Sequence, residues 1–137
     1  MIQQYEIYLP AFRKGYHLIT HLITEKIGKL PEKGIVHIFI KHTSAAISIN
    51  ENADPSVRYD FESFLNKLIP ENDPVYTHTL EGSDDMPAHL KSSLLGQSVT
   101  IPIRNGRLDL GTWQGIYLCE FRRHGGSRTV MVTIIGE

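Results

Sequence analysis

The last third of the chain consists of short alternating segments separated by turn residues, and this pattern limits the possible folds more than any other feature. Asn105 and Gly106 lie between two such segments, and this dipeptide favours the tight turn of a β-hairpin. Segments joined by such short turns pair antiparallel, so this region predicts an antiparallel sheet. The strands expected here are Ser98–Ile103, Arg107–Leu110, Gly115–Phe121 and Arg128–Ile135.

Two helices are expected in the first two thirds of the chain. Apolar residues over Gly15–Leu30 recur with helical spacing and predict the first helix. Asp54 is a suitable N-cap and Pro55 suits the first helical position, so a second helix is expected to begin there and to end at Pro70.

A short third helix is expected after Asp84 and Asp85, with Gly96 at its end. Helices followed by hairpin-connected strands are typical of an α+β fold. We therefore predict a two-layer α/β sandwich in which helices cover one face of a mainly antiparallel sheet. Alternating apolar residues predict the remaining strands, at Gln3–Leu9, Ile35–Lys41 and Ala45–Asn50.

Length and composition favour one domain that spans residues 1–137. The chain is 41% hydrophobic and 21% charged, and it contains neither an internal repeat nor a linker. A chain of this size buries about 68% of its unfolded surface, which is enough for a sizeable core. The net charge is −1 with both signs intermixed, which argues against nucleic acid or an anionic membrane as the main partner.

The expected location is the cytoplasm. No apolar run is long enough to span a bilayer, and the first residues show no signal-peptide pattern. Cys119 is the single cysteine, which excludes an internal disulfide and fits a reducing compartment.

The segment Gly106–Ile116 is the first candidate for a binding site. It holds the only tryptophan, and Thr112, Trp113 and Gln114 offer hydroxyl, indole and amide donors between glycines that let a backbone approach a ligand. The segment is either a turn that completes a polar pocket or an ordinary β-turn with a packed tryptophan.

Two polar segments follow predicted strands in the middle of the chain. His42, with Thr43 and Ser44 after it, could bind a metal or an anion, or could form a turn in which the hydroxyls bond the backbone. Asn50 ends an alternating strand and is the better functional candidate in a segment whose other polar residues cap the following helix or face solvent.

The region between Tyr76 and Lys91 concentrates imidazoles and carboxylates. Its density of such groups suits a divalent cation or acid–base chemistry. Asp85 and His89 are four residues apart on the predicted third helix and therefore share a face, where the carboxylate would orient the imidazole. A structural role for a helical histidine is the alternative.

Glu120 lies on the predicted core face of its strand, where a carboxylate requires a cation, a metal or a raised pKa. A contact with water or with one of the two arginines that follow it is the structural alternative. The nearby loop at His124 and Gly125 leads to Arg128, and such a loop is either an anion cradle or a plain hairpin connection.

These segments together resemble the YjbQ-like family, whose members are described as secondary thiamine-phosphate synthases. The resemblance runs from about Tyr5 to Glu137 and covers nearly the whole chain. The motifs that carry it are His42-Thr43-Ser44-Ala45-Ala46, Asn50-Glu51-Asn52-Ala53-Asp54-Pro55, Glu81-Gly82-Ser83-Asp84-Asp85-Met86-Pro87-Ala88-His89, Gly111-Thr112-Trp113-Gln114-Gly115 and His124-Gly125-Gly126-Ser127-Arg128.

The resemblance implies a homotrimeric α/β sandwich that joins a pyrimidine methyl diphosphate to a thiazole phosphate and releases pyrophosphate, as a weak or secondary activity. A divalent metal ion, Mg²⁺ or Zn²⁺, would help to stabilise the leaving diphosphate. We assign acid–base catalysis to His89 and Glu120, and metal binding to His42, His78 and His124. The residues expected to bind the phosphorylated substrates are Asn50, Asp85, Thr112, Gln114 and Arg128.

Two other functions remain open at this point. A metal-dependent hydrolase could use the same side chains to activate water against a phosphorylated small molecule. A non-catalytic trimer could bind such a molecule without turnover. Release of pyrophosphate that depends on the thiazole partner distinguishes the transferase from both.

Overall fold

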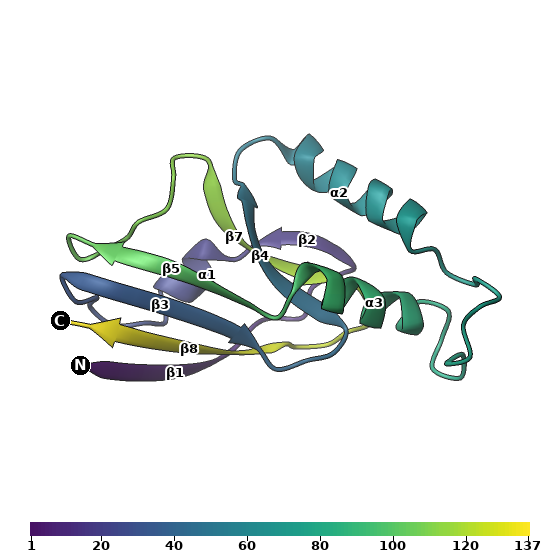
Figure 1. The fold of residues 1–137 in the computed structure, drawn as a ribbon, viewed down its shortest axis with the longest axis horizontal. Coiled ribbons are helices and arrows are strands. Elements are labelled where there is room, and N and C mark those ends of the chain that lie inside the picture. The colour runs from purple at the N-terminus through teal and green to yellow at the C-terminus, as the bar shows by residue number, and fades with distance from the viewer.

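A computed structural model describes all residues of the chain and contains eight strands and three helices (Figure 1). Every strand pair is antiparallel, which confirms the α+β class with mainly antiparallel pairing. The strands are β1 (Ile2–Tyr8), β2 (Gly15–Leu18), β3 (Lys33–Ile40), β4 (Ala45–Glu51), β5 (Ser98–Arg104), β6 (Arg107–Leu108), β7 (Gln114–Glu120) and β8 (Thr129–Gly136). The helices are α1 (Thr20–Thr24), α2 (Pro55–Leu68) and α3 (Asp85–Leu95).

The strands form two sheets rather than the single sheet expected from the sequence. One has the order β1-β8-β3-β5-β6 and the other the order β2-β7-β4. The chain crosses between the two sheets several times, and the crossing from β3 to β4 is a corner that contains His42, Thr43 and Ser44.

The two sheets enclose one hydrophobic core of 16 buried residues. Most of the core residues come from the strands, because every second side chain of a strand points to the same face. In β3 these are Val36, Ile38 and Ile40, and in β7 they are Ile116 and Leu118.

Helices α2 and α3 lie beside the three-stranded sheet, at the end of the molecule away from both termini (Figure 1). A second apolar cluster joins this sheet to α3 through Ala88 and contains Tyr117 and Cys119, which alternate with the core residues of β7. Cys119 is therefore packed, as its position in the strand predicts, and burial raises the pKa of its thiol to about 12.

The prediction of a single long helix over Gly15–Leu30 is wrong. Residues Gly15–Leu18 form β2 instead, and only Thr20–Thr24 are helical. The open edge of β7 explains the difference, because β2 pairs with it from Gly15 opposite Glu120 to Leu18 opposite Tyr117. A tertiary pairing thus overrides the local helical pattern.

Other local predictions are confirmed. Asn105 and Gly106 both have positive φ, 53° and 73°, as the two-residue hairpin between β5 and β6 requires. Asp54 caps α2 by accepting a hydrogen bond from the Ser56 amide at 2.9 Å. None of the helices combines the length and apolarity that a bilayer crossing needs.

Candidate functional site

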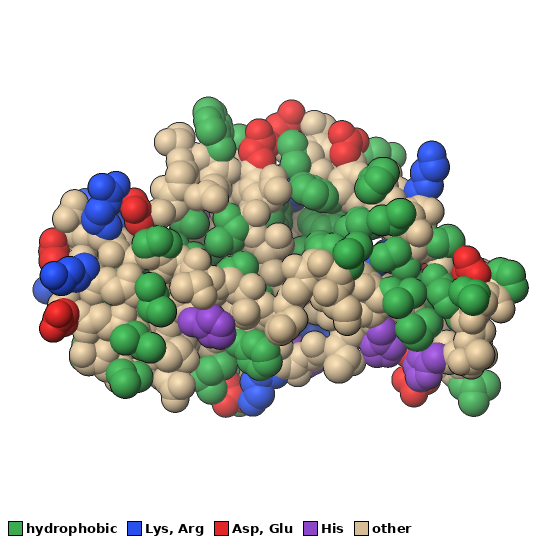
Figure 2. Space-filling model, in the orientation of Figure 1, with side chains coloured by type: hydrophobic (Ala, Val, Ile, Leu, Met, Phe, Trp, Pro, Cys, Tyr) green, Lys and Arg blue, Asp and Glu red, His purple; other side chains and the backbone are tan.

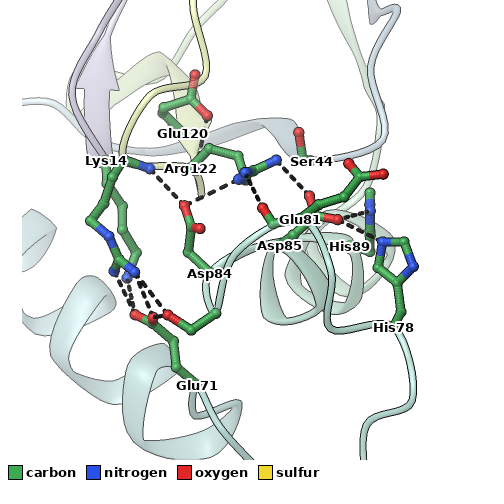
Figure 3. Close-up of polar contacts among 12 residues, drawn as sticks. Lys14, Ser44, Glu71, His78, Glu81, Asp84, Asp85, His89, Glu120 and Arg122 are labelled. Carbon is green, nitrogen blue, oxygen red and sulfur yellow. Dashed lines mark hydrogen bonds and ion pairs between the residues drawn. The ribbon is translucent and has the colours of Figure 1, made fainter.

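Asp85 lies at the centre of a polar cluster at the start of α3. Asp85 is 2% exposed and belongs to the first turn of α3, where the helix dipole favours a negative charge. Its Oδ2 atom lies 2.7 Å from His78 Nε2 and 3.1 Å from His89 Nε2 (Figure 3). The predicted contact between Asp85 and His89 across one turn of helix is therefore confirmed.

The backbone determines which nitrogen of His89 carries a proton. His89 Nδ1 lies 2.8 Å from the carbonyl oxygen of Thr43, which can only accept, so Nδ1 donates. A neutral His89 therefore presents the Nε2 lone pair to the Asp85 carboxylate. The two acceptors require a positive charge between them, supplied either by a proton on Nε2 or by a cation.

The geometry suits a metal ion. One donor atom each from His78, Asp85 and His89 lies within 4.8 Å of the others. Metal-bound histidines usually donate their second ring nitrogen to a carbonyl or carboxylate, as His89 does to Thr43. Two imidazoles and one carboxylate form a ligand set that Zn²⁺ accepts in catalytic sites.

Arg122 holds the other side of Asp85. Its Nη1 donates to Asp85 Oδ1 at 2.6 Å, and its Nε donates to Asp84 Oδ2 at 3.1 Å. Burial opposes ionisation of Asp85, but hydrogen bonds and charges from His78, His89 and Arg122 outweigh it and hold the pKa of Asp85 below its usual value. Asp85 is therefore an ionised carboxylate in a fixed orientation.

A second layer of ion pairs fixes the loop that leads into α3. Asp84 also accepts from the Arg123 amide at 2.9 Å, and the Arg123 guanidinium binds both oxygens of Glu71 at 2.7 Å each. Ser83 donates to the same Glu71 carboxylate. These contacts tie the segment after α2 to the end of β7, so the loop carrying His78 is anchored at both sides of the cluster.

The cluster lies between two surface hollows. His78 lines one of about 320 Å³, with Tyr76 and Met86, and His89 lines another of about 670 Å³, with Lys41 and His42. Histidine side chains are exposed at the molecular surface beside α3, next to an acidic side chain (Figure 2). Small molecules can therefore reach the imidazoles from solvent.

Glu120 and Arg128 form a different cluster, inside the protein. Arg128 donates from Nε to Glu120 Oε1 at 2.8 Å and from Nη2 to Oε2 at 2.6 Å, and Nη2 also reaches Ser44 Oγ at 2.9 Å. Glu120 is 0% exposed and Arg128 is 4% exposed. The core-face carboxylate thus has a cationic partner, as the sequence predicts, and that partner is the Arg128 guanidinium. Arg122 contacts Glu120 only through its backbone amide, which donates to Oε2 at 3.1 Å.

The three histidines predicted to bind a metal are not gathered together. Only His78 belongs to the cluster, with Asp85 and His89 as its neighbours. His42 uses Nε2 to accept a hydrogen bond from the Thr129 amide at 2.8 Å, and burial lowers its pKa, so it is a neutral acceptor at the edge of the larger hollow. His124 is exposed in the loop after β7.

Three predicted substrate-binding residues, Asn50, Thr112 and Gln114, lie at the other end of β4 and β7. Each already accepts a hydrogen bond from a nearby residue. Asn50 Oδ1 accepts from the Glu51 amide at 2.8 Å, and Gln114 Oε1 accepts from the Gly111 amide at 2.8 Å. The Thr112 carbonyl accepts from Asn52 at 3.1 Å. The segment around Trp113 is thus a hydrogen-bonded turn, and Trp113 is 65% exposed rather than packed.

Sequence reasoning misses two contributors to the geometry of this cluster. The sequence suggests Arg122 only as a partner of Glu120, whereas its guanidinium joins Asp84 and Asp85. The Thr43 carbonyl leaves no sequence signal, because any residue at that corner supplies one. The acidic pair before a predicted helix, followed much later by two arginines, was the available signal for Arg122.

The sequence was compared with protein-family models and with known proteins, and relatives match it over its whole length. The sequence model of the family described as UPF0047 protein YjbQ-like matches residues 5–137. UPF0047 protein YjbQ of Salmonella typhimurium is 50% identical over the whole of both chains, and the Escherichia coli O157:H7 protein is 45% identical over the same coverage.

Solved structures agree with the fold. The crystal structure of a YbjQ-like protein of unknown function from Sulfolobus solfataricus superimposes with a TM-score of 0.85 at 30% identity, covering 100% of this chain and 99% of that one. A conserved hypothetical protein from Thermus thermophilus gives a TM-score of 0.84 at 33% identity, with 96% and 99% covered.

Proposed function

Since this chain belongs to the YjbQ-like UPF0047 family, we propose that it catalyses the thiamine-phosphate synthase reaction that the family resemblance implies, with the help of a divalent metal ion. The reaction joins a pyrimidine methyl diphosphate to a thiazole phosphate and releases pyrophosphate. The observation that carries the proposal is the cluster of His78, Asp85 and His89, whose donor atoms lie within 4.8 Å of one another at the surface.

The donor set favours Zn²⁺ over Mg²⁺. Mg²⁺ prefers oxygen ligands and keeps several waters, whereas two imidazoles and one carboxylate suit Zn²⁺ with a further position left for substrate. Bound there, the ion would supply positive charge to the oxygens of the leaving diphosphate. His78, Asp85 and His89 would hold it, and Arg122 keeps Asp85 ionised and oriented.

The buried pair changes which residues we expect to bind phosphate. Arg128 is engaged by Glu120 and does not reach the hollow at His89. Lys41 is exposed in that hollow, so its ammonium group is the cation placed to bind phosphate oxygens there.

The bond changes of the transferase reaction do not require Glu120, which is buried and paired with Arg128. The thiazole nitrogen attacks the methylene carbon with its lone pair, and the carbon–oxygen bond breaks with its electrons leaving on pyrophosphate. The nucleophile loses no proton, so no general base is required. Hydrolysis differs, because attacking water must lose a proton to a base.

The test is a pyrophosphate-release assay on chelator-treated protein reconstituted with Zn²⁺ or Mg²⁺. We expect release that requires both the metal and the thiazole phosphate. His78→Ala should abolish metal retention and turnover, while His124→Ala, an exposed histidine outside the cluster, should leave both unchanged.

The other outcomes each identify a different function. Release that ignores the thiazole phosphate would indicate the metal-dependent hydrolase, and metal binding without any release would indicate a binding protein. Equal turnover by His78→Ala and wild type would refute a role for the cluster.

Two further parts of the proposal concern assembly and location. We propose a homotrimer in the cytoplasm that acts on small phosphorylated molecules. Analytical ultracentrifugation gives the mass of the assembly directly, and a mass of one or two chains would contradict the trimer.

A further inference from the structure

A separate cavity of about 540 Å³ lies between β2 and the first half of α2. None of its lining residues lines the two hollows beside the metal ligands. It therefore belongs to a different region from the proposed reaction site. The segment 12–18 forms one wall, and Arg58, Tyr59 and Glu62 of α2 lie in the other.

Two of its lining residues, Tyr16 and Arg58, each have a buried polar atom without a hydrogen-bond partner, the Tyr16 hydroxyl and Arg58 Nη1. A buried donor without a partner destabilises the folded chain, and a charged one does so more strongly. Native proteins keep few such groups, and those they keep often have a functional reason. Arg58 Nη1 can only donate, whereas the Tyr16 hydroxyl can donate or accept. A ligand acceptor would therefore satisfy both atoms.

The charges around the cavity favour an anionic acceptor. Arg13, Lys14 and Arg58 line it, against Glu62 as the one carboxylate. Lys14 is partly engaged, since it donates to Asn66 at 3.1 Å. The guanidinium of Arg58 offers the planar fork that suits phosphate oxygens.

The wall opposite α2 is held in place before any ligand arrives. His17 donates from Nε2 to the Arg13 carbonyl at 2.7 Å, and its ring stacks on Phe12 with 4.6 Å between the centroids. Gly15 lies between them with φ of +143°, a conformation that side chains other than glycine rarely adopt. Tyr59 adds an exposed aromatic ring at the mouth.

We propose that this cavity is a second site, which binds a small aromatic phosphate ester. Arg58 and Tyr16 donate to the phosphate oxygens, and the aromatic ring of the ligand lies between Phe12 and Tyr59. The site does not depend on the metal cluster or on the transferase reaction, and it binds its ligand in metal-free protein.

The experiment titrates chelator-treated protein with phenyl phosphate and follows backbone amides by ¹H–¹⁵N NMR in about 0.15 M salt. We expect shifts at Gly15, His17 and Arg58, and weaker binding of both inorganic phosphate and phenol. Arg58→Gln should weaken phenyl phosphate binding by about tenfold or more, as the loss of a charge-assisted hydrogen bond does.

Two control variants make the result specific. Arg107→Gln removes an equally charged side chain from an exposed position in β6 and should bind phenyl phosphate like wild type. Tyr16→Phe removes only the hydroxyl and should weaken binding by a smaller factor than Arg58→Gln.

Three results would overturn the proposal. The first is the absence of saturable shifts, and the second is a set of shifts confined to residues outside the cavity. The third is wild-type affinity in Arg58→Gln together with a smaller assembly mass, which would mean that the guanidinium is partnered by a second copy of the chain.

Discussion

Asp85 and Glu120 are both buried carboxylates held by an arginine, but their charges are balanced in different ways. Arg128 binds both oxygens of Glu120, and the pair is sealed from solvent. Arg122 binds one oxygen of Asp85, and the other faces two imidazole nitrogens beside surface hollows. Burial of a carboxylate is thus a poor guide to function, because what matters is whether its charge is already satisfied.

The corner between β3 and β4 connects the two clusters. The Thr43 carbonyl accepts from His89, and the next residue, Ser44, accepts from Arg128 through its hydroxyl. The sealed pair therefore holds the backbone that orients His89. We expect Glu120 and Arg128 to act on the site as positioning residues.

Breaking the sealed pair should have the largest effect on stability. Glu120→Ala leaves the buried guanidinium of Arg128 without its carboxylate, and we expect a loss of about 3–5 kcal/mol in the free energy of unfolding. This corresponds to a fall in Tm of roughly 10 °C or more, measured by differential scanning calorimetry.

Two controls separate charge from packing at this position. Glu32→Gln changes an exposed carboxylate and should leave Tm unchanged within about 2 °C. The double variant Glu120→Leu with Arg128→Met removes both charges and should recover a large part of the lost stability. A double variant less stable than Glu120→Ala would contradict this account.

We expect Zn²⁺ to stabilise the folded chain through the open cluster of His78, Asp85 and His89, and not through the sealed pair of Glu120 and Arg128. Zn²⁺ at about 100 times its Kd stabilises a protein that binds it only when folded by about 2.7 kcal/mol. We expect a rise in Tm of several degrees in wild type and none in His78→Ala, measured by thermal unfolding with and without Zn²⁺. A similar rise in both proteins would locate the metal elsewhere.

The glycine beside the sealed pair tests how tightly it is packed. A Cβ added at Gly125 would lie 2.3 Å from Glu120 Oε1, and the carboxylate cannot move without losing Arg128. Gly125→Ala should therefore lower the free energy of unfolding by about 1–3 kcal/mol in a denaturant titration. Gly111→Ala is the control, because its Cβ meets only the flexible Gln114 side chain at 3.2 Å.

The sequence predicts local relations within these clusters better than distant ones. It places Asp85 and His89 on one helix face and puts Glu120 on the core side of β7, and both follow from the periodicity of single elements. His78 joins the cluster from an irregular loop, seven residues before Asp85, where no periodicity applies. Its contact depends on how that loop is anchored by distant arginines.

The same limit explains the errors in the fold. Hairpin signals and helix caps act within a few residues, so the turn at Asn105 and the start of α2 at Asp54 are predictable. Whether strands share one sheet or two depends on packing between residues far apart in the chain. The division at the corner around Thr43, and the pairing of β2 with β7, are of that kind.

The smallest effect should come from the exposed ion pair that supports the open cluster. Hydrogen bonds from Arg123 and Ser83 lower the pKa of Glu71 from 4.5 to about 2. The carboxylate is therefore ionised more readily in the folded chain than in the unfolded chain, and its stabilising contribution is present above pH 4.5 and disappears as the pH falls toward 2.

Solvent screens this pair, since the Arg123 side chain is 48% exposed, so we expect Glu71 to contribute about 1 kcal/mol or less at neutral pH. Denaturant titrations of wild type and Glu71→Gln should differ by that amount at pH 7 and converge as the pH approaches 2. A difference that grows below pH 4 would reverse the sign of the linkage. Glu71 would then not stabilise the loop that carries His78, and only the contact between Asp84 and Arg122 would hold that loop.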